Sequence, residues 1–104
     1  MSKMQVAFLF LVPDADPKEH RVVMSHSSVL NMTVIPVKDY HQAVQVSQEL
    51  VEQGVQAIEL CGGFGHIGLG KVAEAVGENA AVGAVRFDCH PSMGGKSGDE
   101  IFNS

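Results

Sequence analysis

Two apolar segments near the start of the chain predict strands. Residues 6–12 are hydrophobic without interruption, which is typical of a central strand that is covered on both faces in a parallel sheet. Residues 32–37 are rich in β-branched side chains and predict a second strand. Pro36 favours an edge position for it, because proline lacks the N–H that a sheet ladder needs. Between these segments, residues 13–19 are polar, and residues 21–24 fit either a short strand or a helical turn.

The most regular periodicity predicts a helix that begins after Asp39 and ends at Gly54. Asp39 fits an N-cap, and Gln42, three residues later, completes the capping-box pattern. Apolar residues then recur at helical spacing as far as Gly54, which is suited to a left-handed cap. The remaining predicted elements are a strand over residues 55–61, a short helix over residues 69–76 and a last strand over residues 81–87.

The alternation of strands and helices in the second half predicts two right-handed βαβ units and therefore a parallel sheet. We expect one small α/β domain with a mainly parallel four-stranded sheet, similar to part of a Rossmann or flavodoxin fold. The expected strand order is 2-1-3-4, with helices after the second and third strands. Residues 1–90 are expected to form this domain. Residues 91–104 are expected to form a tail, anchored by Ile101 and Phe102, that packs on the same domain or on a neighbouring subunit.

Composition and charge narrow the classes of protein. The 104 residues are 45% hydrophobic and 18% charged, which is too apolar for a disordered chain. A formal charge of -5 has the wrong sign for binding nucleic acid or an anionic membrane. Two cysteines are too few for a secreted disulfide framework. Residues 6–12 are too short to span a bilayer and lack a signal-peptide cleavage pattern. We expect a cytoplasmic protein with neither nucleic-acid nor membrane partners.

A glycine-rich segment, residues 62–68, lies between a predicted strand and a predicted helix. In that position backbone N–H groups can face an anion at the helix N-terminus. Gly63, Gly65 and Gly68 also spell G-x-G-x-x-G, and Asp88 stands where a dinucleotide fold places its ribose-binding acid. The chain is too short for a complete dinucleotide domain, so we expect no cofactor and favour a small anion or phosphorylated metabolite. A purely structural glycine turn is the alternative.

Further candidates follow from the rule that ligands bind at the carboxyl ends of parallel strands. A carboxylate in a buried strand needs a partner, so Glu59 is expected to pair with Arg86 or to transfer protons. Cys61 acts as a nucleophile only if a helix N-terminus or His66 lowers its pKa. The candidate catalytic residues are Glu59, Cys61 and His66. The candidate ligand-binding residues are Arg21, Gly62, Gly63, Phe64, Gly65, His66, Gly68, Arg86 and Asp88.

Two familiar motifs are incomplete. Cys61, His66, Cys89 and His90 have the chemistry of zinc ligands but not the spacing of a zinc finger or ribbon, so we expect no metal. Residues 95–97, Gly-Lys-Ser, lack the upstream glycine of a phosphate-binding P-loop, which excludes nucleotide hydrolysis by that route.

Four segments together carry a resemblance. They are ELCGGFG at residues 59–65, AVGAVRFD at 81–88, DPKEHR at 16–21 and GKSGDEIF at 95–102. They resemble a family of short, mainly bacterial proteins that is known only as a domain of unknown function. The resemblance implies a compact α/β unit, supplies no activity or catalytic residue, and counts against a dehydrogenase. It also implies a variable residue at the position of His66, which argues against catalysis there.

Two classes of function follow. The first is binding of a small anionic or phosphorylated molecule at the glycine loop, with catalysis left open. The second is a non-catalytic interaction module whose glycines serve close packing. Two helices cannot cover both faces of a four-stranded sheet, so we expect apolar surface to serve a partner and the protein to be a homo-oligomer.

Overall fold

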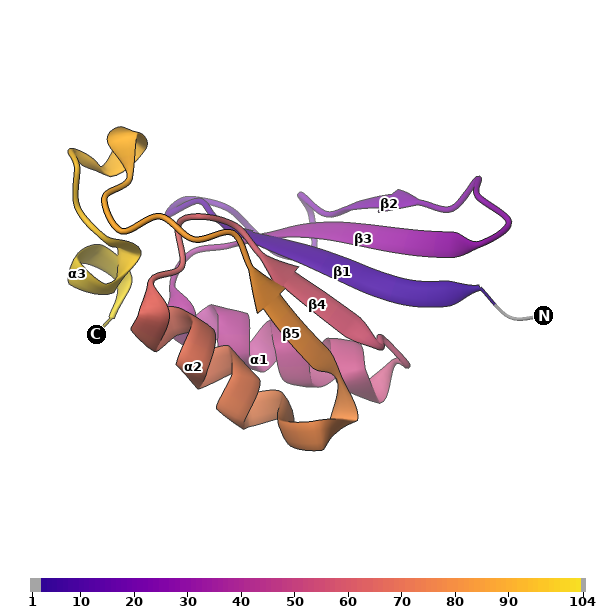
Figure 1. Ribbon diagram of the computed structural model, residues 1–104. Coiled ribbons are helices and arrows are strands. Elements are labelled where there is room, and N and C mark those ends of the chain that lie inside the picture. The colour runs from indigo at the N-terminus through magenta and orange to yellow at the C-terminus, as the bar shows by residue number, and fades with distance from the viewer. Residues whose placement is uncertain (1–2, 104) are drawn as a thin grey trace.

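The computed structural model describes residues 3–103, and it contains one five-stranded sheet in the order β2-β3-β1-β4-β5 (Figure 1). The strands are β1 (Met4–Leu11), β2 (Val22–Met24), β3 (Leu30–Val37), β4 (Ala57–Leu60) and β5 (Ala81–Ala84). The helices are α1 (Tyr40–Glu52), α2 (His66–Val76) and α3 (Gly98–Phe102), with 3-10 turns η1 (Gly77–Asn79) and η2 (Pro91–Met93). Only β2 pairs antiparallel, with β3; the other neighbours are parallel.

The expected α/β class and the mainly parallel sheet are confirmed. The four strands expected from the sequence are β1, β3, β4 and β5, and their observed order, β3-β1-β4-β5, is the predicted 2-1-3-4. The expected count of four is one strand short, because residues 22–24 form the short edge strand β2 rather than a helical turn.

The expectation that Pro36 marks an edge strand is wrong, because β2 lies outside β3. The Val37 carbonyl accepts a hydrogen bond from the Val12 N–H at 2.9 Å, so the backbone groups of Val37 face β1. Successive residues face opposite neighbours, so those of Pro36 face the β2 side. There β2 begins with Val22 opposite Val34, two residues short of Pro36. The missing N–H therefore removes no ladder bond.

The predicted caps of α1 are present. The Asp39 carboxylate accepts a hydrogen bond from the Gln42 N–H at 2.8 Å. The Gln42 side chain reaches back to the Lys38 N–H at 2.8 Å, one residue before the position expected in a capping box. Gly54 follows the helix at φ +99°, the left-handed conformation that favours glycine.

Other boundaries differ from the prediction. The helix α2 begins at His66, three residues before the expected start, because the glycine-rich segment enters the helix directly. The strands β4 and β5 are each four residues long, so Arg86 lies beyond the end of β5 rather than in it.

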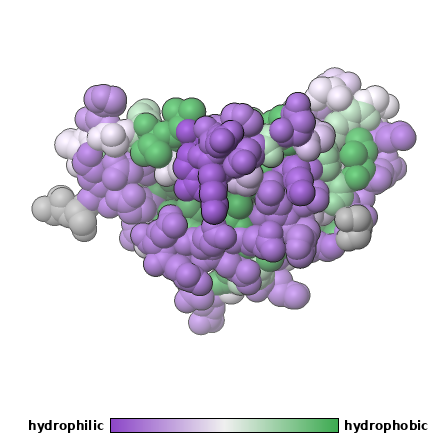
Figure 2. Space-filling view, turned by 180° about the vertical axis from the view of Figure 1, so that it is seen from behind, coloured by the Kyte–Doolittle hydropathy of each residue, from purple (hydrophilic) through white to green (hydrophobic). Residues whose placement is uncertain are grey.

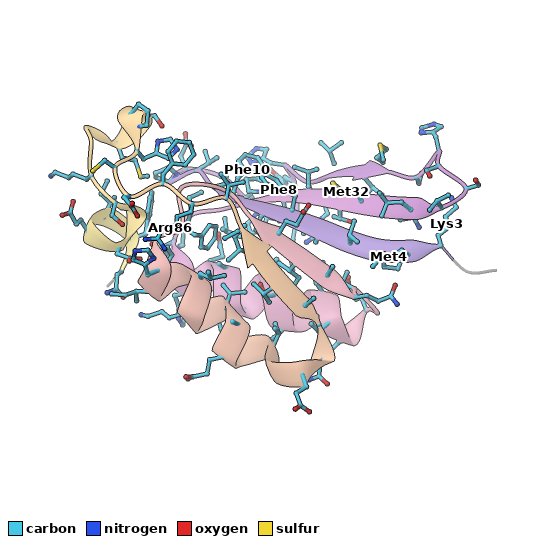
Figure 3. All side chains as sticks on the ribbon, in the orientation of Figure 1. Lys3, Met4, Phe8, Phe10, Met32 and Arg86 are labelled. Carbon is cyan, nitrogen blue, oxygen red and sulfur yellow. The ribbon has the colours of Figure 1, made fainter. Side chains whose placement is uncertain are left out.

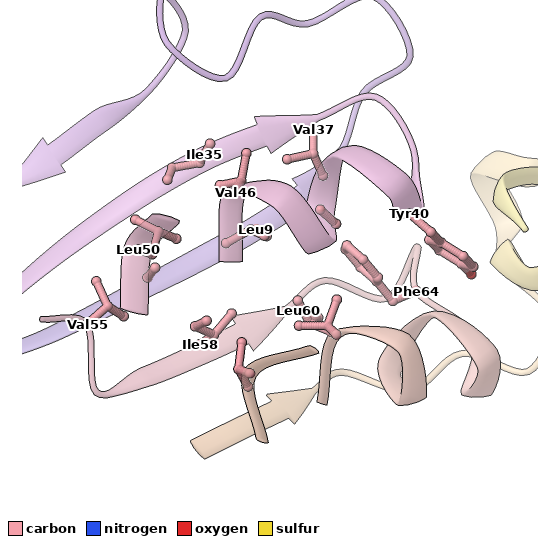
Figure 4. Packing of buried hydrophobic residues seen from close by; sticks show 14 residues of the cluster. Leu9, Ile35, Val37, Tyr40, Val46, Leu50, Val55, Ile58, Leu60 and Phe64 are labelled. Atoms are coloured by element: carbon pink, nitrogen blue, oxygen red, sulfur yellow. The ribbon is translucent and has the colours of Figure 1, made fainter. Parts of the chain in front are cut away.

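Both long helices lie on the same side of the sheet (Figure 1). The core fills the space between these helices and the sheet. Leu9, Ile35 and Ile58 of the strands are fully buried there, against α1 and α2 (Figure 4). The expectation that β1 is covered on both faces is therefore wrong, although its central place is confirmed. Phe8 and Phe10, on the side of the sheet away from α1 and α2, are only half-buried (Figure 3).

The tail packs on its own chain. Its helix α3 lies beside the start of α2, and the Phe102 ring lies 6.1 Å from the Tyr40 ring, centroid to centroid. Of the two expected anchors, Phe102 is half-buried, whereas Ile101 is 47% exposed. Within residues 3–103 no helix has the length and apolar character needed to cross a membrane.

Candidate functional site

A carboxylate from the tail occupies the N-terminus of α2. The N-cap residue, Gly65, has no side chain that could accept a hydrogen bond. Asp99 takes this role, since its Oδ2 accepts from the Ile67 N–H at 3.0 Å and its Oδ1 from the Gly68 N–H at 3.1 Å. A negative charge there is stabilised by the free N–H groups and by the helix dipole. The amides expected to face an external anion are thus bound within the chain.

Tyr40 joins this terminus to the core. Its hydroxyl donates to Asp99 Oδ1 at 2.8 Å and accepts from the Gly65 N–H at 3.0 Å, while its ring stacks on Phe64 with centroids 5.5 Å apart. Burial raises the pKa of the Tyr40 phenol, which keeps it a neutral donor. Burial also works to raise the pKa of Asp99, but the hydrogen bonds from Ile67, Tyr40 and Gly68 outweigh it, so the pKa is lowered from 3.8.

The glycines of the loop serve close packing. A Cβ atom at Gly62 would meet the Phe87 ring, one at Gly65 the Asp99 carboxylate, and one at Gly68 the Tyr40 ring. None of the glycines in residues 62–70 has a positive φ, so none is required by backbone conformation.

Beside this terminus lies a cleft of about 580 Å³ between the start of α2 and the segment that follows β5. Arg86 is the one basic side chain in its lining besides His66. The Nη2 and Nε atoms of Arg86 lie 3.0 Å and 3.1 Å from Asp88 Oδ1. The Arg86 Nη2 also lies 3.0 Å from His66 Nε2. Because a guanidinium only donates, Nε2 is the acceptor in this contact. Figure 3 places Arg86 at the end of α2 nearest α3.

The structure brings five of the predicted ligand-binding residues together and separates the others. Those that line the cleft are Phe64, Gly65, His66, Arg86 and Asp88. Gly62, Gly63 and Gly68 are buried beneath other side chains. Arg21 lies elsewhere, beside α1, where its Nε donates to the Pro17 carbonyl at 2.9 Å.

The three candidate catalytic residues lie in three different places. Ile58 and Leu60 face the core, so Glu59 between them faces the uncovered side of the sheet and is exposed. The expected pairing of Glu59 with Arg86 is wrong, because Arg86 pairs with Asp88. Cys61 lines a second hollow of about 410 Å³ under the tail, where its Sγ accepts from the Gly63 N–H at 3.3 Å.

Cys61, His66, Cys89 and His90 do not form one cluster. No group of three or more His, Cys, Asp or Glu side chains across residues 3–103 is placed to hold a metal ion. His90 instead accepts a hydrogen bond from the Ser92 N–H at 3.2 Å, as the cap of η2.

The sequence pattern did not point to Asp99 or Tyr40 as parts of this site. One signal was available. A helix that starts at a glycine has no side chain of its own to bind its first N–H groups, so an acceptor must come from elsewhere. In this chain the acceptor comes from a residue that lies 31 to 32 positions further along.

Comparison with known proteins places the chain in a family. No curated protein and no solved structure matches it. A family model with the description "Family of unknown function (DUF6506)" matches residues 4–100. The match includes every strand, both long helices, the glycine loop and Asp99. The chain therefore belongs to this family of unknown function, the kind of family that its motifs resemble.

Proposed function

We propose that the protein binds a small molecule with an apolar body and a single negative charge in the cleft beside α2. The observation that carries this proposal is the position of Arg86 in a cleft whose other walls are largely apolar. Phe64, Leu69, Val85 and Phe87 supply those walls. Small-molecule sites typically combine such walls with a few polar groups that orient the ligand.

Arg86 is the group that suits an anion. Its Nη1 makes no hydrogen bond with any residue between 3 and 103, which leaves N–H donors available to a carboxylate. His66 and Asp88 both contact Nη2 and so hold the same edge of the guanidinium. A ligand carboxylate is therefore expected to bind the outer edge of Arg86.

The charges around the cleft favour a monoanion over a dianion. Asp88 and Asp99 both line it, and like charges at close range oppose each other. A carboxylate carries one negative charge at neutral pH, whereas a phosphate monoester carries up to two. We therefore favour a carboxylate, and a phosphate ester is the competing ligand class.

The first testable prediction concerns Arg86. Benzoate and hexanoate at millimolar concentration should raise the melting temperature of the protein, since a ligand at 100 times its dissociation constant adds about 2.7 kcal/mol. Phenyl phosphate should raise it less. Arg86→Ala should abolish the shift, whereas Lys71→Ala, which removes the same charge from an exposed position on α2, should retain it. Equal shifts in both variants, or none in the wild type, would contradict the proposal.

We assign binding to this cleft and no reaction, because Glu59, Cys61 and His66 lie apart.

We also propose that the protein acts in the cytoplasm. Support comes from Cys61 and Cys89, both free thiols, as is usual in a reducing compartment.

A further inference from the structure

The side of the sheet away from the helices is a surface with the composition of a core. Side chains alternate along each strand, and those of Leu9, Ile35 and Ile58 point into the core. The strand registers therefore place on the opposite side the even-numbered residues of β1, β2 and β3 and the odd-numbered residues of β4 and β5. We call this set the open face.

Almost all of the open face is apolar. Its central residues are Val6, Phe8, Met32 and Val34, and Glu59 is its single ionisable residue. Val6 is 8% exposed although it is not part of the core cluster. Figure 3 shows Phe8, Phe10 and Met32 on this side of the sheet, and the Phe8 and Phe10 rings stack with centroids 6.4 Å apart.

No helix within residues 3–103 covers this face, and its centre, Phe8, Met32 and Val34, is half-buried by neighbouring side chains. The loop after β1 reaches only one end of it, where it forms a shallow hollow with Phe10 and Pro36. The tail is held at the opposite side, against α2 and Tyr40. At the other margin, Val22 is 64% and Met24 48% exposed. Seen from behind, hydrophobic groups reach the upper surface, while the lower, helical half is mostly hydrophilic (Figure 2).

The lengths of the strands set the size of this face. Strands lie about 4.8 Å apart and rise about 3.3 Å per residue. Two strands of eight residues, two of four and one of three therefore cover about 430 Å² in flat outline. The side-chain surface of such a face is larger than its outline. A standard interface buries about 800 Å² on each partner.

Charge argues for a second copy of the same chain. The formal charge of -5 resides almost wholly outside the open face, so two copies that meet there bring only one carboxylate each, that of Glu59, into the interface. With Glu59 as its single charged residue, the face also has little to select a partner of complementary charge. Two copies related by a two-fold axis bury the same apolar patch on both sides.

We infer that the open face is the interface of a homodimer in which two sheets pack face to face. Aligned sheets pack about 10 Å apart with interdigitating side chains. Phe8 and Val34 form the centre of the interface, and the flexible side chains of Met4 and Met24 adapt at its margin. This inference is independent of the ligand proposed for the cleft.

The second prediction tests the dimer with two neighbouring residues of β2. Met24 is 48% exposed on the open face, and Val23 is 51% exposed on the other side of the same strand. Sedimentation velocity of the full chain from about 1 µM to about 100 µM should show a wild-type dimer. Met24→Glu should raise its dissociation constant at least about tenfold, while Val23→Glu should leave it unchanged.

Three outcomes would overturn the inference: a wild-type monomer throughout, an assembly that both variants weaken equally, or one that neither weakens. If Met24→Glu does not fold, the dimer can be tested on the wild type alone by measuring the rates at which its methionines oxidise. With dilute peroxide, Met4 and Met24 should oxidise more slowly at high protein concentration than at low concentration. Met93, in the tail, should show no such dependence and is the internal control. Equal behaviour of all three methionines would also overturn the dimer.

Discussion

Two glycines of α2 show how one residue type serves different purposes in the same helix. Gly68 is buried, and a Cβ atom there would meet the Tyr40 ring. Gly70, two residues later, is exposed, and a Cβ atom there would have nothing within 4 Å. The first glycine is required by packing, and the second only weakens the helix.

The third prediction uses this pair. Gly70→Ala should raise the free energy of unfolding by about 0.5–1 kcal/mol, because alanine loses less backbone entropy in a helix. Gly68→Ala should lower it by about 1–3 kcal/mol, because the added methyl forces the Tyr40 ring aside. Urea unfolding measures both values. A stabilising Gly68→Ala would show that the ring does not rest on this glycine.

Residue identity alone misled the assignment of Glu59. A carboxylate within an apolar strand suggests a buried ion pair, but that inference depends on whether both faces of the strand are covered. Here Glu59 alternates with Ile58 and Leu60 and faces solvent in the monomer. In the proposed dimer it lies beside Phe8, its register partner on β1, with only β5 between it and the edge of the sheet.

At the scale of elements, α2 depends on α3 for its N-terminal cap. The Asp99 carboxylate binds two N–H groups of α2, and the Tyr40 hydroxyl of α1 holds the same carboxylate. One ionised side chain therefore connects all three helices.

The fourth prediction is a pH dependence of this connection. Because the pKa of Asp99 is lower in the folded chain than its ordinary value of 3.8, the ionised carboxylate stabilises the fold above that value. The stabilisation is lost as the pH falls from about 4 through the lower folded pKa. Asp99→Asn should therefore melt below the wild type at pH 7, and the difference should shrink below pH 4. Asp14→Asn, in an exposed loop, is the control, and a pH-independent difference would contradict the assignment.

The periodicity of the chain was sufficient to predict α1, which depends on local pattern. It was also sufficient to predict the parallel sheet, which follows from the handedness of βαβ units. The sequence did not show that α1 and α2 share one side of the sheet. A seven-residue apolar run is compatible with cover by helices on both faces or with a face that awaits a partner. The start of α2 could not be predicted, because its N-cap residue, Gly65, has no side chain that would signal a cap.

Topology also predicted part of the site. His66, Arg86 and Asp88 were expected at one edge because their strands are parallel neighbours, and they line one cleft. Arg21 did not join them, because the loop after β1 passes beside α1 instead. Asp99 could not be placed, since nothing in the spacing of residues 91–104 indicates which part of the domain the tail meets.

At the scale of the whole molecule, the protein has two chemically different sides. The helical side carries α1, α2 and the docked tail, whereas the other side presents the open face. The proposed ligand cleft lies at the end of the sheet near α3, away from the centre of the open face. Binding and assembly can therefore be tested separately.

The fifth prediction follows from assembly through the open face. If unfolding also separates two copies, the melting temperature should rise with protein concentration, because a hundredfold increase adds about 2.7 kcal/mol by mass action. Calorimetry at about 1 µM and about 100 µM should show this rise for the wild type and for Val23→Glu, and a smaller one for Met24→Glu. A melting temperature that is the same at both concentrations would argue against a dimer.

The position of Asp99 also bears on how the chain folds as it is made. Among the five strands of this sheet, β1 is synthesised first and becomes the centre, but its partners β3 and β4 are synthesised later. The carboxylate that caps α2 comes later still. Pairings this distant in sequence slow folding, because the chain loses the entropy of closing a long loop before the stabilising contacts form. The nascent chain therefore completes its native structure only after residue 99 has left the ribosome, and until then the apolar strands depend on protection from aggregation.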